Sequence, residues 1–284
     1  MEQGRGVAEA VSIPAEGAGR EPFFFEYGEM VALGERLHER YVSADPYPHI
    51  VVDDFLPGSV ATEILTRFPG PEAPCWQSDA AGHQAGKLGT RHASRLDSIP
   101  GSLYYHLLLF NSSPFVAFLE KLTGISGLIP DPHLKGGGLH QIPRGARLDV
   151  HADFNRYHEL KLDRRINALF YLNPDWDPAW GGQLELWSRD MSECRQRIDP
   201  IFNRLAVFST TSTSYHGHPE PLDCPEGVTR KSIAFYYYTN GRPASERRLS
   251  HSTLWQRRPG EVRSAESGGR VRNLLRRLWR HLRG

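Results

Sequence analysis

The chain has 284 residues, of which 39% are hydrophobic and 24% charged, and its net charge is +1. These values are typical of a globular protein, and no apolar run approaches the ~18–20 residues that a membrane-spanning helix needs. The three cysteines lie far apart and form no Cys-x-x-Cys pair, which argues against a disulfide scaffold or a thiolate zinc site. No basic segment followed by an apolar block opens the sequence, so we expect a cytoplasmic location.

The charge is unevenly distributed along the chain. Residues 242–284 contain twelve arginines and three glutamates, a net charge of +9 out of the total of +1, which leaves −8 for the rest. Apolar residues recur at helical spacing among these arginines, at Val271, Leu274, Leu275, Leu278 and Leu282. We therefore predict that residues 241–284 form an arginine-rich linker and a basic amphipathic helix. Its candidate contacts are its own domain, a partner protein or an anionic membrane surface, and no recognition motif indicates a specific nucleic acid.

The first part of the chain has the pattern of a tail followed by helices. Residues 1–20 are rich in Gly, Ala and Glu without apolar periodicity, and we predict a disordered tail. Four later segments have apolar residues at helical spacing and are predicted helices: residues 31–41, 58–68, 104–110 and 114–123. Residues 76–94 have no clear period, and we predict a long loop there that is a candidate lid over a binding site.

The later part of the chain is rich in short aromatic and β-branched segments separated by Gly, Pro, Asn and Asp. This pattern predicts strands. Several short strands preceded by helices favour an α+β protein with a β-sandwich or jelly-roll core. We place one domain at residues 21–240, with its β core at about residues 139–240.

One predicted strand, residues 147–153, carries two side chains of metal-binding types. Side chains of an extended segment alternate between its faces, so His151 and Asp153 project to the same side. An imidazole and a carboxylate in this arrangement are half of a metal site. A second histidine from a distant strand would complete a 2-His-1-carboxylate triad, which leaves three coordination positions open and suits non-haem Fe(II).

An ordered set of motifs accompanies this pair. The set comprises residues 48–57, His151-Ala152-Asp153, Phe170-Tyr171-Leu172-Asn173, Asp175-Trp176, Gly181-Gly182-Gln183-Leu184, Ser214-Tyr215-His216-Gly217 and Arg230. With these motifs, residues 45–240 resemble the Fe(II)/2-oxoglutarate-dependent dioxygenases, in their prolyl-hydroxylase-like branch. The resemblance implies a double-stranded β-helix, or jelly-roll, core with flanking N-terminal helices, to which this chain adds the predicted basic C-terminal helix.

The resemblance also implies a metal centre. His151, Asp153 and a distal histidine would bind the iron and form the catalytic centre. His216 and His218 are both candidates for the distal position. We favour His216, because it stands in the family's Ser-x-His-Gly context, and we interpret His218 as a turn residue or a neighbour of the ligands.

The cosubstrate 2-oxoglutarate needs a cation for its distal carboxylate, and a planar guanidinium can bind a carboxylate through two hydrogen bonds. Arg230 and Lys231 compete for this role. We favour Arg230, because it shares its strand face with small residues and matches the position of the family's basic residue. The resemblance assigns Tyr171 to the same carboxylate, and alternation makes Asn167 a further cosubstrate-binding candidate on the face of Tyr171.

The implied reaction is hydroxylation of an unactivated C–H bond with Fe(II), O2 and 2-oxoglutarate, which leaves as succinate and CO2, and ascorbate is a candidate reductant. The implied substrate is a peptidyl or amino-acid-like group, with a small molecule or natural product as the alternative. Two further alternatives are a non-catalytic jelly-roll module and a cupin-like metal protein that uses no 2-oxoglutarate. The sequence does not indicate an oligomeric state.

Overall fold

The computed structural model describes residues 22–78, 82–90 and 99–261. The tail predicted at residues 1–20 lies outside the described residues, and so does the basic helix predicted around residues 271–282. Among the helices that the structure describes, none combines the length and the hydropathy that crossing a bilayer requires.

Four α-helices precede the main strands, and each corresponds to a predicted helix. They are α1 (Tyr27–Val42), α2 (Gly58–Thr66), α3 (Gly101–Leu109) and α4 (Ser113–Thr123). Helix α4 begins with Pro114 in its first turn and ends at Gly124, which has the left-handed conformation that favours glycine. Helices α1 and α4 pack closely because Gly34 has no side chain: a Cβ there would lie 2.6 Å from the Phe118 carbonyl oxygen.

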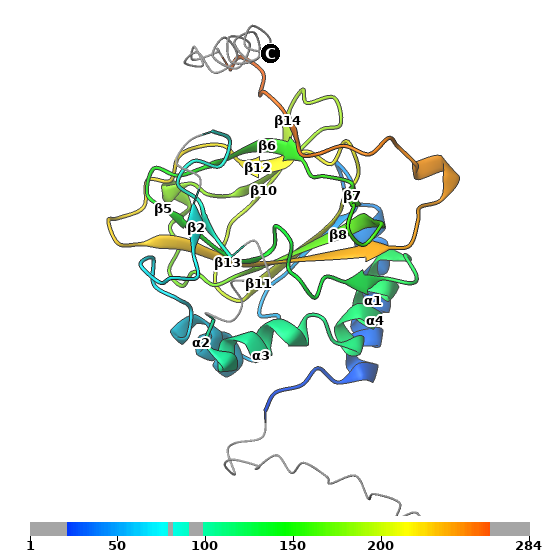
Figure 1. Ribbon diagram of the computed structural model, residues 1–284, viewed down its shortest axis with the longest axis horizontal. Helices are drawn as coiled ribbons and strands as arrows, with labels where there is room; N and C mark the ends of the chain where they lie inside the picture. Colours follow the sequence, from blue (N-terminus) through cyan, green and yellow to red (C-terminus); the bar gives the residue numbers. More distant parts are fainter. Residues whose placement is uncertain (1–21, 79–81, 91–98, 262–284) are drawn as a thin grey trace, which may run out of the picture.

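The strands form two antiparallel sheets, and Figure 1 shows them facing each other with the helices outside the larger one. The larger, nine-stranded sheet has the order β1 (His49–Val52), β11 (Arg204–Ser209), β8 (Leu162–Tyr171), β13 (Thr229–Thr239), β5 (Gly138–Pro143), β3 (Leu88–Gly89), β2 (Gln77–Ser78), with β4 (Ile129–Pro130) beside β13 and β7 (Arg156–Tyr157) beside β8. The smaller, five-stranded sheet has the order β10 (Cys194–Ile198), β9 (Leu184–Trp187), β12 (His216–His218), β6 (Leu148–Ala152), β14 (Leu254–Trp255).

The two faces of the larger sheet have different compositions because side chains alternate along β8 and β13. The outward-facing residues are apolar and pack under the helices: Ile166, Ala168, Phe170, Ile233, Phe235 and Tyr237. The inward-facing residues Asn167, Leu169, Ser232 and Tyr236 line a cavity between the two sheets. The pattern of these two strands therefore provides both the core and one wall of a binding site.

Aromatic rings dominate the core between the larger sheet and the helices. Phe110, which follows α3, is fully buried and stacks on Phe235 of β13 with ring centroids 4.4 Å apart. Phe25 and Phe115 contact the same ring edge-on, at 5.9 and 5.0 Å. Aromatic side chains bury large areas and favour these two geometries, so the cluster fixes the helical layer on the sheet.

Two segments depart from the sequence predictions. The loop predicted over residues 76–94 contains β2 and β3, which extend the larger sheet beyond β5. The linker predicted from residue 241 contains β14, which pairs with β6 at the edge of the smaller sheet. Both departures involve two-residue strands, which are too short to produce a period in the sequence.

Phe110→Ala is expected to lower the free energy of unfolding by ~3–5 kcal/mol, because it leaves a cavity in the aromatic cluster. Urea denaturation followed by circular dichroism would measure the loss. Phe24→Ala is the matched control, since Phe24 is 65% exposed, and it should cost less than ~1 kcal/mol. Similar losses for the two variants would contradict the assignment of Phe110 to the core.

Candidate metal centre

Three of the predicted site residues lie together between the sheets. His151 lies on β6, and Asp153 follows directly after the strand. Strand β12 pairs with β6 so that His216 lies directly opposite His151, with the ring centroids 4.5 Å apart. One donor atom from each of the three residues lies within 4.8 Å of the others, the arrangement of a candidate metal site. Antiparallel pairing thus joins residues that are 65 positions apart in the sequence.

Backbone carbonyls fix the orientation of both imidazoles. The Nδ1 atom of His151 lies 2.9 Å from the Asp149 carbonyl oxygen, and Nδ1 of His216 lies 3.0 Å from the Ser214 carbonyl oxygen. A carbonyl oxygen only accepts, so Nδ1 carries the hydrogen in both rings and Nε2 has the free lone pair. The two Nε2 atoms lie 3.5 and 3.4 Å from the Asp153 carboxylate oxygens. Such hydrogen bonds are typical of histidines that bind metals.

The ionisation states suit a divalent cation. Burial lowers the pKa of His151, and the neighbouring His216 lowers it further, so the ring is neutral near pH 7. Burial alone would raise the pKa of Asp153, but the neighbouring Arg164 charge holds it well below its usual value. The site therefore presents an uncharged His151 ring and a carboxylate anion, the forms in which these residues bind metals.

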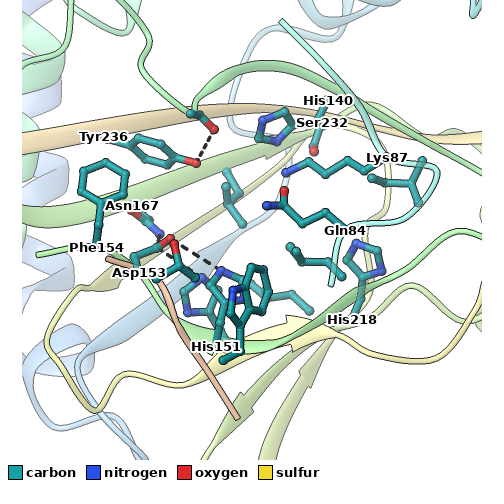
Figure 2. Close-up of a pocket in the computed structure, with 18 of the residues that line it drawn as sticks. Gln84, Lys87, His140, His151, Asp153, Phe154, Asn167, His218, Ser232 and Tyr236 are labelled. Atoms are coloured by element: carbon teal, nitrogen blue, oxygen red, sulfur yellow. Dashed lines mark hydrogen bonds and ion pairs between the residues drawn. The ribbon is translucent and has the colours of Figure 1, made fainter. Parts of the chain in front are cut away.

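The cavity beside these residues has a volume of about 150 Å³ and receives side chains from both sheets. Figure 2 shows Asp153, Asn167, Phe154 and Tyr236 on one side and Lys87, His140 and His218 on the other. Gln84 and Lys87 come from the segment predicted as a lid, and Lys87 is buried. The opening of the metal site is therefore bordered on one side by residues 84–87.

Residues after the last core strand complete another part of the wall. Trp255 of β14 lines the cavity and packs against His151, with ring centroids 4.8 Å apart. Trp255 also contacts His83, whose ring stacks on the indole at 4.3 Å and whose Nδ1 donates a 2.8 Å hydrogen bond to the Asp149 carboxylate. The sequence did not indicate that His83 or Trp255 belongs to the site, because both lie in segments without periodicity.

His218 faces the same cavity but lies outside the three-residue cluster. The register of β12 against β6 shifts between His216 and His218. Burial, together with the charges of Arg230 and Lys87, places the pKa of His218 well below its usual value, so the ring is neutral. Its Nδ1 atom is buried and has no hydrogen-bond partner among the described residues.

Arg230 and Tyr171 meet at the inner face of the larger sheet. The Arg230 side chain is 4% exposed; its Nε donates to the Gly182 carbonyl oxygen at 2.7 Å and its Nη2 to the Tyr171 hydroxyl at 3.3 Å. In the described part of the chain this guanidinium makes no salt bridge. An unpaired charge is costly to bury, so the arrangement favours an anionic ligand in the cavity. Lys231 points to the other face and contacts Thr229.

Asn167 lies in the cavity wall, but its amide is held by other residues of the site. Its Nδ2 donates to Asp153 Oδ2 at 2.8 Å, and its Oδ1 accepts from Arg164. Arg164 also contacts the Asp153 carboxylate, at 2.9 Å. Alternation from Asn167 predicts that Arg165, not Arg164, faces inward, so the sequence did not indicate this second cavity arginine.

Three comparisons with known proteins agree with this geometry. Residues 137–238 match the model of the 2OG-Fe(II) oxygenase superfamily. A stretch of 86 residues, 28% of this chain, is 33% identical to the prolyl 3-hydroxylase OGFOD1 of Mus musculus, and covers 15% of that relative. The chain thus matches only a small part of the mouse protein.

Two solved structures have the same fold at low sequence identity. A prolyl hydroxylase of Trichoplax adhaerens, solved with a peptide fragment of the hypoxia-inducible factor oxygen degradation domain, has a TM-score of 0.54 at 18% identity. That alignment covers 74% of this chain and 91% of the other. A prolyl 4-hydroxylase of Phytophthora capsici has a TM-score of 0.53 at 16% identity, over 82% of this chain and 73% of the other.

The fold, the cluster of donors and the family match define a class of protein. Residues 137–238 match the 2OG-Fe(II) oxygenase superfamily, and the fold resembles that of the solved prolyl hydroxylases. The predicted family resemblance and the jelly-roll fold are therefore confirmed. Fe(II) and 2-oxoglutarate are the metal and cosubstrate of this superfamily.

Replacing either histidine of the cluster should remove metal binding, whereas replacing His218 should not. We expect His216→Ala to weaken Co(II) binding by more than ~100-fold, since losing a ligand exceeds the effect of losing a ligand's hydrogen-bond partner. His218→Ala should stay within ~3-fold of the parent chain, because His218 is outside the cluster. Titration followed by visible absorption measures both affinities. The reverse result would make His218 the distal ligand.

Proposed function

We propose that this chain is a non-haem Fe(II)- and 2-oxoglutarate-dependent dioxygenase that hydroxylates an unactivated C–H bond of a peptidyl or amino-acid-like substrate. One observation carries the proposal: a buried arginine without an acidic partner in the described residues lines the same cavity as the three metal donors. A metal site alone would suit many enzymes. A metal site with an adjacent anion subsite suits an enzyme that binds an oxo acid on the metal.

His151, Asp153 and His216 are the proposed metal ligands. Two imidazoles and one carboxylate form the facial triad that suits Fe(II) and leaves three positions for other ligands. The Nε2 lone pairs converge on the Asp153 carboxylate, and the backbone carbonyls behind the rings keep them in that orientation. The donor set therefore fits the metal of the superfamily.

Arg230 and Tyr171 are the proposed partners of the distal carboxylate of 2-oxoglutarate. Burial of Arg230 strengthens its attraction for an anion, because the surroundings screen the charge less than water does. The Gly182 carbonyl and the Tyr171 hydroxyl hold the guanidinium in place before any ligand arrives. The anion then gains charge-assisted hydrogen bonds at little ordering cost.

When bound, Fe(II) and 2-oxoglutarate would supply the oxidation: one oxygen atom of O2 enters the substrate C–H bond, and the other enters succinate as CO2 is released. The chain contributes binding, orientation and exclusion of water. Phe154 and Trp255 cover apolar parts of the cavity beside the metal donors. Such walls limit access of solvent to the reacting groups.

Similarity to proline-modifying enzymes supports the substrate class. The sequence relative is a prolyl 3-hydroxylase, and the Trichoplax enzyme was solved with a peptide fragment. We therefore propose a peptide or protein substrate, with prolyl hydroxylation as the first reaction to test. Fold similarity alone does not establish a substrate, so this step relies on the family relation.

The decisive experiment is an anaerobic titration of the Fe(II)-loaded chain with 2-oxoglutarate. We expect a weak visible metal-to-ligand charge-transfer band, which forms only when the oxo acid chelates the iron. His151→Ala should lose the band through loss of iron, and Arg230→Met should require at least ~10-fold more 2-oxoglutarate to develop it. Arg230→Lys is the conservative control and should retain part of the affinity. Iron-loaded, folded protein without the band would refute the proposed function.

A second test uses the two adjacent glycines of the Gly181-Gly182 turn. Both have a positive φ, of 77° and 78°, so alanine strains the backbone at either position, by ~1–3 kcal/mol. A Cβ at Gly182 would also lie 3.0 Å from Arg230 Cδ and 2.7 Å from Leu222 Cδ2, whereas nothing lies within 4 Å of one at Gly181. We expect Gly182→Ala, but not Gly181→Ala, to weaken 2-oxoglutarate binding by ~10-fold, in the same spectroscopic titration. Equal affinities would exclude a role of Gly182 in positioning Arg230.

A further inference from the structure

We propose that Arg164 and Asn167 form a clamp that positions the Asp153 carboxylate so that only one of its oxygens faces the metal. The inference rests on the proposed function, because it assigns a task to residues around a proposed ligand. It concerns positioning residues, since neither side chain is itself among the three metal donors.

The clamp is a closed set of hydrogen bonds. Arg164 Nη2 lies 2.9 Å from Asp153 Oδ2, and Asn167 Nδ2 donates to the same oxygen at 2.8 Å. Arg164 also donates to Asn167 Oδ1, from Nε at 3.1 Å and from Nη2 at 2.7 Å. Each member therefore orients the other two. Asp153 Oδ2 receives both clamp donors and Oδ1 receives neither, so Oδ1 is the oxygen left for a metal.

The guanidinium itself is held by aromatic rings. It lies 3.5 Å from the Tyr236 ring centroid and 4.6 Å from that of Phe154, and the Arg164 side chain is 1% exposed. The Tyr236 hydroxyl donates to the Gly136 carbonyl oxygen at 2.9 Å, which fixes that ring (Figure 2). A buried ion pair with this packing has a defined geometry, and loss of one partner leaves an uncompensated charge.

A β-bulge places Arg164 on the inner face. In the pairing of β8 with β13, Tyr237 lies opposite Ile166 and Tyr238 lies opposite Arg164, so Arg165 has no partner. The extra residue reverses the alternation, and bulges commonly redirect a side chain next to an active site. Arg165 instead extends away from the cavity and pairs with Glu246, at 3.0 Å. The bulge thus turns one arginine of the pair toward Asp153 and the other toward the surface.

The clamp also sets the charge that an incoming ligand meets. Arg164 compensates the Asp153 carboxylate within the protein, at 2.9 Å. Because Asp153 is already paired with Arg164, the positive charge of a bound divalent cation would be balanced mainly by the anionic oxo acid. Without the clamp, the carboxylate would be free to rotate and to chelate the cation through both oxygens.

The test uses Co(II) as the probe, added to the full chain freed of metal, with visible ligand-field absorption as the readout. Arg164→Met should weaken Co(II) binding by ~10–100-fold, the usual effect of removing a hydrogen-bond partner of a metal ligand. It should also change the ligand-field spectrum, because the freed carboxylate can bind through both oxygens. Arg164→Lys should recover only part of the affinity, since one ammonium cannot reproduce the guanidinium contacts with Asn167 and Asp153.

Arg165→Met is the matched control, because it removes an arginine of the same bulge whose partners are Thr239 and Glu246. It should leave Co(II) affinity and the spectrum unchanged. Equal effects of Arg164→Met and Arg165→Met, or a loss of thermal stability in Arg164→Met with unchanged affinity and spectrum, would overturn the clamp. If Arg164→Met does not fold, Asn167→Ala decides, with at least ~10-fold weaker binding expected and unchanged binding as the refutation.

The proposed function and the clamp fail in different ways. If the parent chain does not bind Co(II), or binds it as tightly after His151→Ala, the metal centre itself is refuted. If the parent chain binds Co(II), and His151→Ala abolishes binding while Arg164→Met has no effect, the metal centre stands and only the clamp is refuted.

Discussion

The alternation of side chains along β8 and β13 is the constraint on which the rest of the structure depends. One face of these strands carries the aromatic and aliphatic residues that pack under the helices, and the other carries Asn167, Ser232 and Arg230 into the cavity. The stability of the helical layer and the composition of the site are therefore linked. A one-residue slip of β13 would exchange the two sets and bury polar groups in the core. The aromatic cluster around Phe110 thus also maintains the register of the site.

Strands of the smaller sheet position the candidate metal donors, and the pairing of β6 with β12 brings the two short motifs that carry them together. His151 and His216 lie directly opposite each other on neighbouring strands, and the carbonyls of Asp149 and Ser214 orient their rings. Segments outside the family match then enclose the donors. Residues 82–90 and β14 meet where His83 stacks on Trp255, beside His151. The candidate metal donors thus lie within the family match, whereas part of the cavity wall comes from these flanking segments.

The sequence predicted the four helices from their apolar spacing and the jelly-roll core from its short aromatic and β-branched segments. It predicted the residues of the donor cluster from their motifs. It did not predict that Arg164 faces the cavity. Simple alternation assumes a regular strand, and the β-bulge at Arg165 becomes visible only in the pairing of β8 with β13. It did not predict β14, because two residues carry no period and the strand forms only by pairing with β6. The contribution of residues 82–87 is likewise tertiary, since His83 and Lys87 acquire their positions from contacts distant in sequence.

Two buried arginines in one cavity would be an electrostatic liability unless each had a separate anion. Arg164 has Asp153 at 2.9 Å, and its charge is compensated within the protein whether or not a ligand is bound. Arg230 contacts a carbonyl, a hydroxyl and a ring and makes no salt bridge among the described residues, which supports the proposal that an anionic ligand pairs with it. In the proposed function, Asp153 therefore has its cationic partner before a metal binds, whereas Arg230 gains its anionic partner from the oxo acid. The partners of the two arginines, more than their shared burial, thus separate a positioning role from a ligand-binding role.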